Sequence, residues 1–144
     1  MAVEYDAVSV LGDGEAWRLL ADVSLGRLVT HFGGQLEIFP VNFVVADRTV
    51  LFRTAEGTKL FTTMMSDQVL FEADDHTDEG GWSVIVRGVA EILNTAEEIH
   101  AADRTGLIPW VATEKLRYVR IRPSQVSGRL FRFGPEPQHG SLPG

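Results

Sequence analysis

The 144-residue sequence contains no cysteine, which excludes disulfide bonds, thiolate metal sites and thiol catalysis. It also has no apolar run that approaches the roughly 20 residues needed to cross a bilayer. The N-terminal stretch MAVEYDAVSV carries neither the basic segment nor the apolar segment of a secretory signal peptide. We therefore expect a cytoplasmic protein with no membrane partner.

Positive charge is scarce. The chain has 13 lysines and arginines against 20 aspartates and glutamates, which gives a net charge of −7. This balance argues against nucleic acid as a partner, because binding to its phosphate backbone depends on positive charge. Acidic residues gather in DDHTDEGG (74–81), whereas basic residues gather in 117–133. A basic segment in an acidic protein serves either a local anion or a solvated strand face, and both interpretations stay open.

Metal-binding and nucleophilic patterns are missing too. Histidines occur at positions 31, 76, 100 and 139, and no pair has a metal-ligand spacing such as HxxxH. The acidic segment 74–81 lacks the spacing of an EF-hand loop, and we interpret it as a solvated surface loop. Ser83 has no GxSxG elbow around it, so nucleophilic hydrolysis is not expected.

The sequence does contain a series of short segments rich in β-branched and aromatic residues, separated by turn signals. Strands are predicted over residues 26–32, 35–40, 41–46, 49–54, 68–75, 82–94 and 115–133. Pro123 is expected to break the last strand, and Gly88 is expected to form a bulge or a bend. The turns between several segments are short, which favours antiparallel hairpins.

Three short helices are predicted between these strands, over residues 12–24, 58–66 and 95–106. Asp13 is expected to cap the first helix, and Thr95 with Glu98 to form a capping box at the third. About six or seven hairpin-connected strands without βαβ alternation predict a mainly β protein, in the form of a closed or partly closed antiparallel barrel. We expect a single domain over residues 1–133 and a flexible tail over 134–144.

The segment RTAEGTK joins a predicted strand to a predicted helix, and it gathers groups that suit a phosphate. Arg53 offers a planar fork of donors, Lys59 a point charge, and Thr54 and Thr58 hydroxyl groups. A helix start adds free N–H groups and partial positive charge, and Gly57 allows a close backbone approach or a positive φ. The same residues are also typical of an ordinary strand–turn–helix, with Thr as the N-cap and Lys59 in solvent.

Five motifs follow one another along the chain: GRLVTHFGGQLEIFPVNFVV, LFRTAEGTKL, QVLFEAD, WSVIVRGVAEI and YVRIRPSQVSGR. The ordered set resembles the pyridoxamine-phosphate-oxidase-like family of FMN-binding split β-barrel proteins, particularly its small actinobacterial-type members. The resemblance covers about residues 14–131. It implies a split antiparallel β-barrel and a homodimer, with two FMN molecules bound in clefts between the subunits.

The resemblance also implies which residues bind the cofactor. The phosphate cradle corresponds to Arg53, Thr54, Thr58 and Lys59, with Gly57 in the turn between them. The strand beside the flavin ring corresponds to Phe39, Pro40, Val41 and Asn42. Trp82 and Ser83 match positions that line the cofactor cleft. Trp110 and Arg129 match a contribution from the partner subunit.

One departure from the family bears on the reaction. Pyridoxamine phosphate oxidases end in a pattern like a Phe-Trp-Gln-Gly turn followed by Arg-Leu-His, which grips the substrate. The corresponding stretch here reads VSGRLFRF, with no Trp and no His. The resemblance therefore supports a flavin-type cofactor more than vitamin B6 oxidation or any other named substrate.

We interpret the chain as a flavin-dependent oxidoreductase that moves hydride between flavin N5 and a small molecule, with the cofactor carrying the redox chemistry. No side chain is predicted to act as a catalytic acid or base. Three alternatives stay open. The cofactor could be the deazaflavin F420 on the same fold, the chain could bind a flavin or haem without catalysis, or it could be a structural dimer without a ligand.

Overall fold

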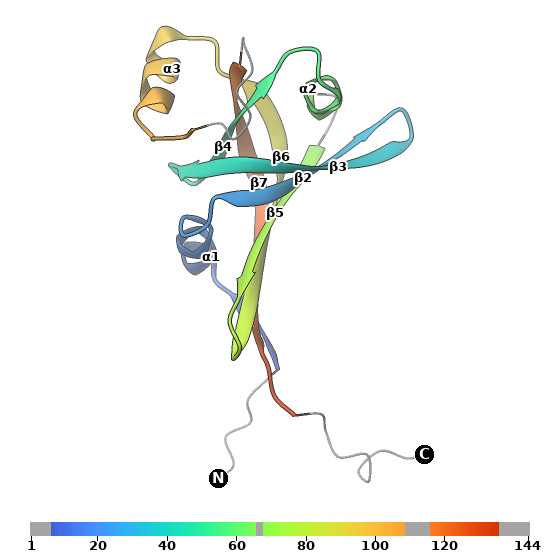
Figure 1. Ribbon diagram of the computed structural model, residues 1–144, viewed down its shortest axis with the longest axis vertical. Helices are drawn as coiled ribbons and strands as arrows, with labels where there is room; N and C mark the ends of the chain where they lie inside the picture. Colours follow the sequence, from blue (N-terminus) through green and yellow to red (C-terminus); the bar gives the residue numbers. More distant parts are fainter. Residues whose placement is uncertain (1–6, 66–67, 109–115, 136–144) are drawn as a thin grey trace.

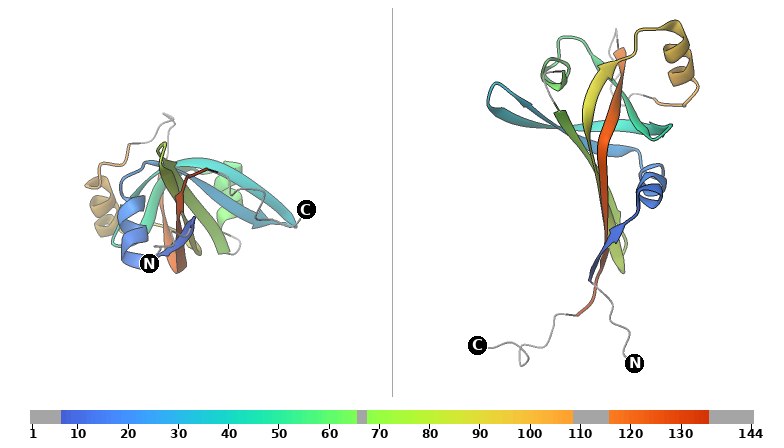
Figure 2. Two further views of the ribbon diagram at one scale, coloured as in Figure 1. Left: turned by 90° about the horizontal axis from the view of Figure 1, so that it is seen from below. Right: turned by 180° about the vertical axis from the view of Figure 1, so that it is seen from behind.

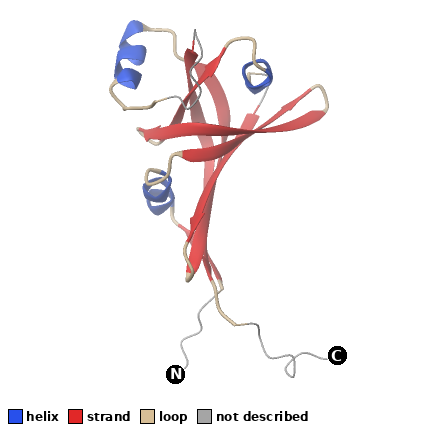
Figure 3. Ribbon diagram, viewed as in Figure 1, coloured by secondary structure: helices blue, strands red, loops and turns tan. Residues whose placement is uncertain are grey.

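The computed structural model describes residues 7–65, 68–108 and 116–135. Within these ranges the chain forms seven strands and three short helices, and the strands dominate (Figure 3). The strands are β1 (Val8–Leu11), β2 (Leu25–Phe32), β3 (Gln35–Ala46), β4 (Thr49–Ala55), β5 (Gln68–His76), β6 (Gly80–Ile92) and β7 (Leu116–Arg132). The helices are α1 (Asp13–Leu20), α2 (Lys59–Met64) and α3 (Ala96–Asp103).

The strands close into an antiparallel barrel. Their order in the sheet is β1-β7-β4-β3-β2-β5-β6, and a further pairing of β6 with β7 closes the barrel, so that β1 is a short addition to β7. β5, β6 and β7 run along much of the molecule, whereas β2, β3 and β4 cross its upper part (Figures 1 and 2). β7 pairs with β4 near its start and with β1 near its end, and it follows β6 along most of its length. The predicted fold class, a mainly β split barrel, is confirmed.

The core lies inside the barrel and follows the two-residue period of the strands. Inward-facing residues such as Phe43, Phe52 and Phe71 are fully buried, and the rings of Phe43 and Phe71 meet edge to face with centroids 4.7 Å apart. Trp17 and Leu20 of α1 join the same cluster, as their helical spacing predicts. Burial of each large side chain contributes roughly 2 kcal/mol, so the interior is the main source of stability.

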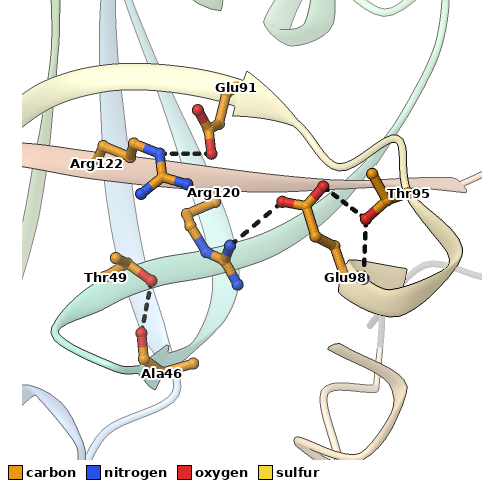
Figure 4. Close-up of polar contacts among 7 residues, drawn as sticks. All are labelled: Ala46, Thr49, Glu91, Thr95, Glu98, Arg120 and Arg122. Atoms are coloured by element: carbon orange, nitrogen blue, oxygen red, sulfur yellow. Dashed lines mark hydrogen bonds and ion pairs between the residues drawn. The ribbon is translucent and has the colours of Figure 1, made fainter. Parts of the chain in front are cut away.

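A second, smaller cluster holds α3 against the outer face of the barrel. Its buried members are Leu51, Leu93, Ala102, Leu107 and Tyr118. The backbone N–H of Glu98 donates to the Thr95 hydroxyl at 3.1 Å, so the predicted N-cap is confirmed. Beside this cap, Arg120 Nη1 lies 3.7 Å from the Glu98 carboxylate, and Arg122 Nε donates to Glu91 at 2.6 Å (Figure 4). These pairs border the docked helix.

Two predicted strand breaks are wrong, and both involve proline. Residues 35–46 form one strand, and β7 continues through Pro123. Pro40 pairs with Arg27 of β2, and the pairing of β3 with β4 on its other side does not reach it. Pro123 pairs with Gly88 of β6, and on its other side it lies between the residues of β7 that pair with β4 and those that pair with β1. A proline without an N–H donor is tolerated where a strand has a neighbour on one side only.

The acidic segment 74–81 is not the solvated loop that was predicted. β5 extends to His76 and β6 begins at Gly80, so most of the segment belongs to a hairpin whose residues are largely exposed. Gly81 makes this pairing possible, because a Cβ there would lie 2.7 Å from the Asp75 carbonyl oxygen.

Two further differences concern the N-terminal region. Asp13 is the first residue of α1 and not its cap; Gly12 is the N-cap, and no side chain caps the helix. The Asp13 carboxylate still lies in the first turn, where its negative charge interacts favourably with the helix dipole and stabilises the helix. The short strand β1 was not predicted. In the part of the chain that is described, no helix has the length and apolar character to cross a membrane.

Candidate functional site

The candidate site lies where β3 and β4 separate. Their pairing ends at Phe43 and Phe52, so Asn42 and Arg53 are the first residues beyond the ladder on the two strands. The Asn42 side-chain amide donates to the carbonyl oxygen of Ile108, which ties the loop after α3 to β3. Val41 is buried and Pro40 is exposed beside it. The structure therefore brings the predicted ring-side strand next to the predicted phosphate cradle.

Arg53 is half-buried and fixed in place. Its guanidinium carbon lies 4.4 Å from the centroid of the Tyr118 ring, and Tyr118 is its cross-strand partner on β7. One terminal nitrogen donates to the Leu116 carbonyl oxygen at 3.4 Å. The Nε atom is buried and has no hydrogen-bond partner among the described residues. A buried donor of this kind is costly unless something accepts from it.

The Tyr118 side chain is held in turn by α3. Its hydroxyl donates to the Asp103 carboxylate at 2.6 Å, and its ring is buried in the second cluster. Burial and the bond to Asp103 raise the pKa of Tyr118 above its usual value, against the opposing charge of Arg53. The hydroxyl therefore stays protonated and donates at neutral pH.

Thr58 is the N-cap of α2. Its hydroxyl accepts from the Phe61 N–H at 3.1 Å and lies 2.8 Å from the Ala55 carbonyl oxygen, to which it donates. The Thr54 hydroxyl lies 3.3 Å from the Thr58 hydroxyl. Gly57 has a φ of +83°, so of the two roles considered for this glycine the structure shows the positive φ. This geometry confirms the strand–turn–helix, and it shows that the Thr58 hydroxyl is used within the turn.

Lys59 points toward the β2–β3 hairpin. Its Nζ atom lies 2.6 Å from a carboxylate oxygen of Glu37, although the lysine side chain remains largely exposed. The hairpin and α2 are also joined by a buried hydrogen bond of 2.9 Å between the hydroxyl groups of Thr30 and Thr63. An anion that binds Lys59 would have to compete with Glu37 for its charge.

The remaining predicted residues lie at the other end of β7. Ser83 pairs with Arg129, and Trp82 pairs with Leu130. Arg129 is eleven residues along the strand from Tyr118, or roughly 36 Å of extended chain. Trp82 borders a hollow of about 360 Å³ together with the end of the β5–β6 hairpin and residues 130–132. One copy of the chain does not bring these residues to Arg53, and Trp110 lies outside the described residues.

The outer face of β2 and β5 carries an ion cluster that the sequence did not predict. Arg27 Nη1 lies 3.0 Å from Glu72 and 3.2 Å from Asp74. Burial, together with the hydrogen bond and the negative charge of Asp74, raises the pKa of Glu72 to about 7 despite Arg27. The available signal was the two-residue spacing of Glu72 and Asp74, which places both carboxylates on one face of a strand.

Comparisons with known proteins agree with the split-barrel fold. The family model described as pyridoxamine 5'-phosphate oxidase matches residues 12–130. A protein of Mycobacterium tuberculosis is 53% identical over 94 residues, which make up 65% of this chain and 86% of that protein. A solved structure of an FAD-binding protein from Mycobacterium smegmatis is 54% identical, with a TM-score of 0.81 and coverage of 88% of this chain and 100% of that chain. A conserved protein of Corynebacterium diphtheriae is 41% identical, with a TM-score of 0.75 and coverage of 88% and 99%.

Proposed function

Since the chain belongs to the pyridoxamine 5'-phosphate oxidase family of split β-barrel proteins, we propose that it binds a flavin nucleotide and acts as a flavin-dependent oxidoreductase. The observation that carries the proposal is Arg53, whose buried Nε has no partner among the described residues beside the point where β3 and β4 separate. A relative that is 54% identical and binds FAD supports the flavin class.

The residues around Arg53 fit the phosphate of such a cofactor. Arg53 supplies a fixed guanidinium, and Lys59 supplies a second positive charge 2.6 Å from Glu37. Charge-assisted hydrogen bonds to phosphate are about twice as strong as neutral ones, so these two residues would hold the anionic end. Pro40, Val41 and Asn42 would border the ring. A bound flavin supplies hydride transfer at its N5 atom, and the chain orients it and excludes water.

The proposal includes a homodimer. Trp82, Ser83 and Arg129 lie at the far end of β7 from Arg53, so a second copy is needed to bring such residues to the same cofactor. Leu36 and Ile38 of β3 and Ile85 and Val89 of β6 are exposed, and we take these four residues to define the contact surface between the copies. Burial of this surface between two copies would favour association, because it removes apolar area from water.

The test is a comparison of flavin binding with and without the phosphate. The purified protein is examined for flavin absorbance and then titrated with FMN, FAD, riboflavin and F420. We expect FMN or FAD to bind at least tenfold more tightly than riboflavin, since a charge-assisted hydrogen bond contributes about 1.5–3 kcal/mol. Arg53→Gln should remove most of that preference. Glu37→Gln should increase it several-fold, because Lys59 is released from its carboxylate partner.

Each outcome assigns a different function. If the wild-type protein binds none of these compounds, the flavin proposal is wrong and a structural dimer is favoured. Preferential binding of F420 would retain the oxidoreductase class and change the cofactor. A bound flavin that neither NAD(P)H nor another donor reduces, with no turnover, would favour a non-enzymatic binding protein.

A further inference from the structure

We propose that Tyr118, held by Asp103 of α3, is a positioning residue that keeps Arg53 available to the phosphate of the bound nucleotide. The inference rests on the proposed function, because it assigns a role in the same site to two residues outside the predicted cradle. Neither residue needs to touch the cofactor, since both act through Arg53.

Strand register and an aromatic ring hold Arg53 in place. Arg53 and Tyr118 are directly opposite each other on β4 and β7, so the strand register fixes both side chains. The ring attracts the guanidinium through its face, at 4.4 Å from the centroid. A carboxylate partner would instead occupy the N–H groups and cancel the charge. An aromatic partner immobilises the cation and leaves its donors for another acceptor.

Lys59 provides the contrast within the same site. Its ammonium group is 2.6 Å from the Glu37 carboxylate, so its charge is already matched by an internal anion. Arg53 has no carboxylate contact of this kind among the described ion pairs, and its only described hydrogen bond is the 3.4 Å contact with the Leu116 carbonyl oxygen. The two cations are thus held in different ways, and Arg53 is the one that is prepared for an incoming anion.

The Tyr118 ring is itself held in position by α3. The Tyr118 hydroxyl donates to Asp103 at 2.6 Å, and the ring belongs to the buried cluster that also contains Leu51, Leu93, Ala102 and Leu107. Asp103 is the last residue of α3. The helix that packs on the outer face of the barrel therefore also fixes the Tyr118 ring that contacts the Arg53 guanidinium. The chain of contacts runs from α3 through Tyr118 to the guanidinium.

Arg120 is a natural control, because it resembles Arg53 in one respect only. Its Nε atom is also buried without a hydrogen-bond partner among the described residues. A carboxylate oxygen of Glu98 nevertheless lies 3.7 Å from its Nη1 atom (Figure 4), and its cross-strand partner on β4 is Leu51 and not an aromatic residue. Arg120 should therefore contribute structure and no phosphate preference.

The experiment measures the ratio of the dissociation constants of riboflavin and FMN. Tyr118→Leu removes the ring and should lower this ratio about tenfold. Tyr118→Phe and Asp103→Ala keep the ring but remove its anchor, and each should lower the ratio two- to fourfold. In an Arg53→Gln background none of the three should change it further. Arg120→Gln should leave the ratio at the wild-type value.

The results separate the inference from the proposed function. A wild-type protein that binds neither flavin, or both equally, overturns the proposed function and this inference with it. A wild-type preference for FMN that survives in folded Tyr118→Leu overturns the inference alone. If Tyr118→Leu does not fold, Tyr118→Phe and Asp103→Ala provide the test. The inference is overturned if both variants keep the wild-type ratio of dissociation constants. It is also overturned if they lower this ratio equally in the wild-type and Arg53→Gln backgrounds.

Discussion

At the scale of single residues, the strongest electrostatic perturbation outside the candidate site is the Arg27–Glu72–Asp74 cluster. Folding raises the pKa of Glu72 from 4.5 to about 7, chiefly through burial and the adjacent Asp74. The folded state therefore binds the Glu72 proton more tightly than the unfolded state does. The contribution of this group to stability is largest below pH 4.5 and is lost as the pH rises toward 7.

Replacing Glu72 with glutamine should remove this loss of stability at high pH. The Gln amide can donate to Asp74 as the protonated carboxyl does, and it carries no charge to bury. Glu72→Gln should raise the free energy of unfolding by about 1 kcal/mol at pH 8, with a smaller gain at pH 5. Urea denaturation at both pH values measures the difference, and Asp78→Asn, which removes an exposed carboxylate of the turn between β5 and β6, is the control. A less stable Glu72→Gln protein at pH 8 would mean that attraction to Arg27 dominates.

Residue-level prediction succeeded where the signal is local. The cap at Thr95 was predicted, and the structure confirms it. The cap at Thr58 and the positive φ of Gly57 were each one of two interpretations, and both features depend on neighbours in the chain. The partners of Arg53 and Lys59 were not predicted. Tyr118 and Glu37 lie 65 and 22 residues away along the sequence, and only strand register brings them into contact.

At the scale of elements, the bulge between β6 and β7 is the most constrained feature. The register shifts between Arg87 and Gly88, where Pro123 lies opposite Gly88. The two backbones approach closely at this point, since a Cβ on Gly88 would lie 2.1 Å from the Arg122 carbonyl oxygen. Gly88 therefore allows the longest strand pair of the barrel to pass a proline without separating.

A methyl group at position 88 should open this bulge. Gly88→Ala forces the Cβ against backbone atoms that cannot rotate away, so we expect a loss of about 2–3 kcal/mol in the free energy of unfolding. Gly14→Ala is the matched control, because its Cβ would meet only the flexible end of Arg48 at 3.4 Å. That change should stabilise α1 by about 0.5 kcal/mol. Equal stabilities of the two variants in urea would show that the bulge tolerates a side chain.

Elements were predictable where hydrophobic periodicity and turn signals agree. β2, β4 and α3 were predicted within a few residues of their observed ends. The errors at Pro40 and Pro123 have a shared cause, because a proline stops a strand only where a neighbour needs its N–H. Whether a neighbour is present depends on the order β7-β4-β3-β2-β5-β6, which local sequence does not contain.

At the scale of the whole molecule, barrel closure separates two groups of candidate residues. β7 carries the partner of Arg53 near its start and Arg129 near its end, and it pairs with β6 along most of its length. The long strand pair thus stabilises the barrel and also holds the two groups apart. A complete site therefore requires two copies if both groups serve one cofactor.

We therefore expect flavin binding and dimerisation to be lost together. Ile38 is 62% exposed on the outer face of β3, within the proposed contact surface. At micromolar protein concentration we expect the wild-type protein to be a dimer and Ile38→Glu to be a monomer, because a charge buried in an apolar contact is strongly unfavourable. Light scattering measures the difference in mass. Its affinity for FMN should fall at least tenfold although Arg53 and Lys59 are unchanged.

Ala101→Glu adds the same charge to an exposed position of α3, and it should keep both the dimer and the wild-type affinity. Full FMN affinity in a monomeric Ile38→Glu protein would mean that one copy binds the cofactor alone. In that case the residues near Arg129 would have no part in the site. A dimer that persists in Ile38→Glu would instead place the contact between copies on another face of the barrel.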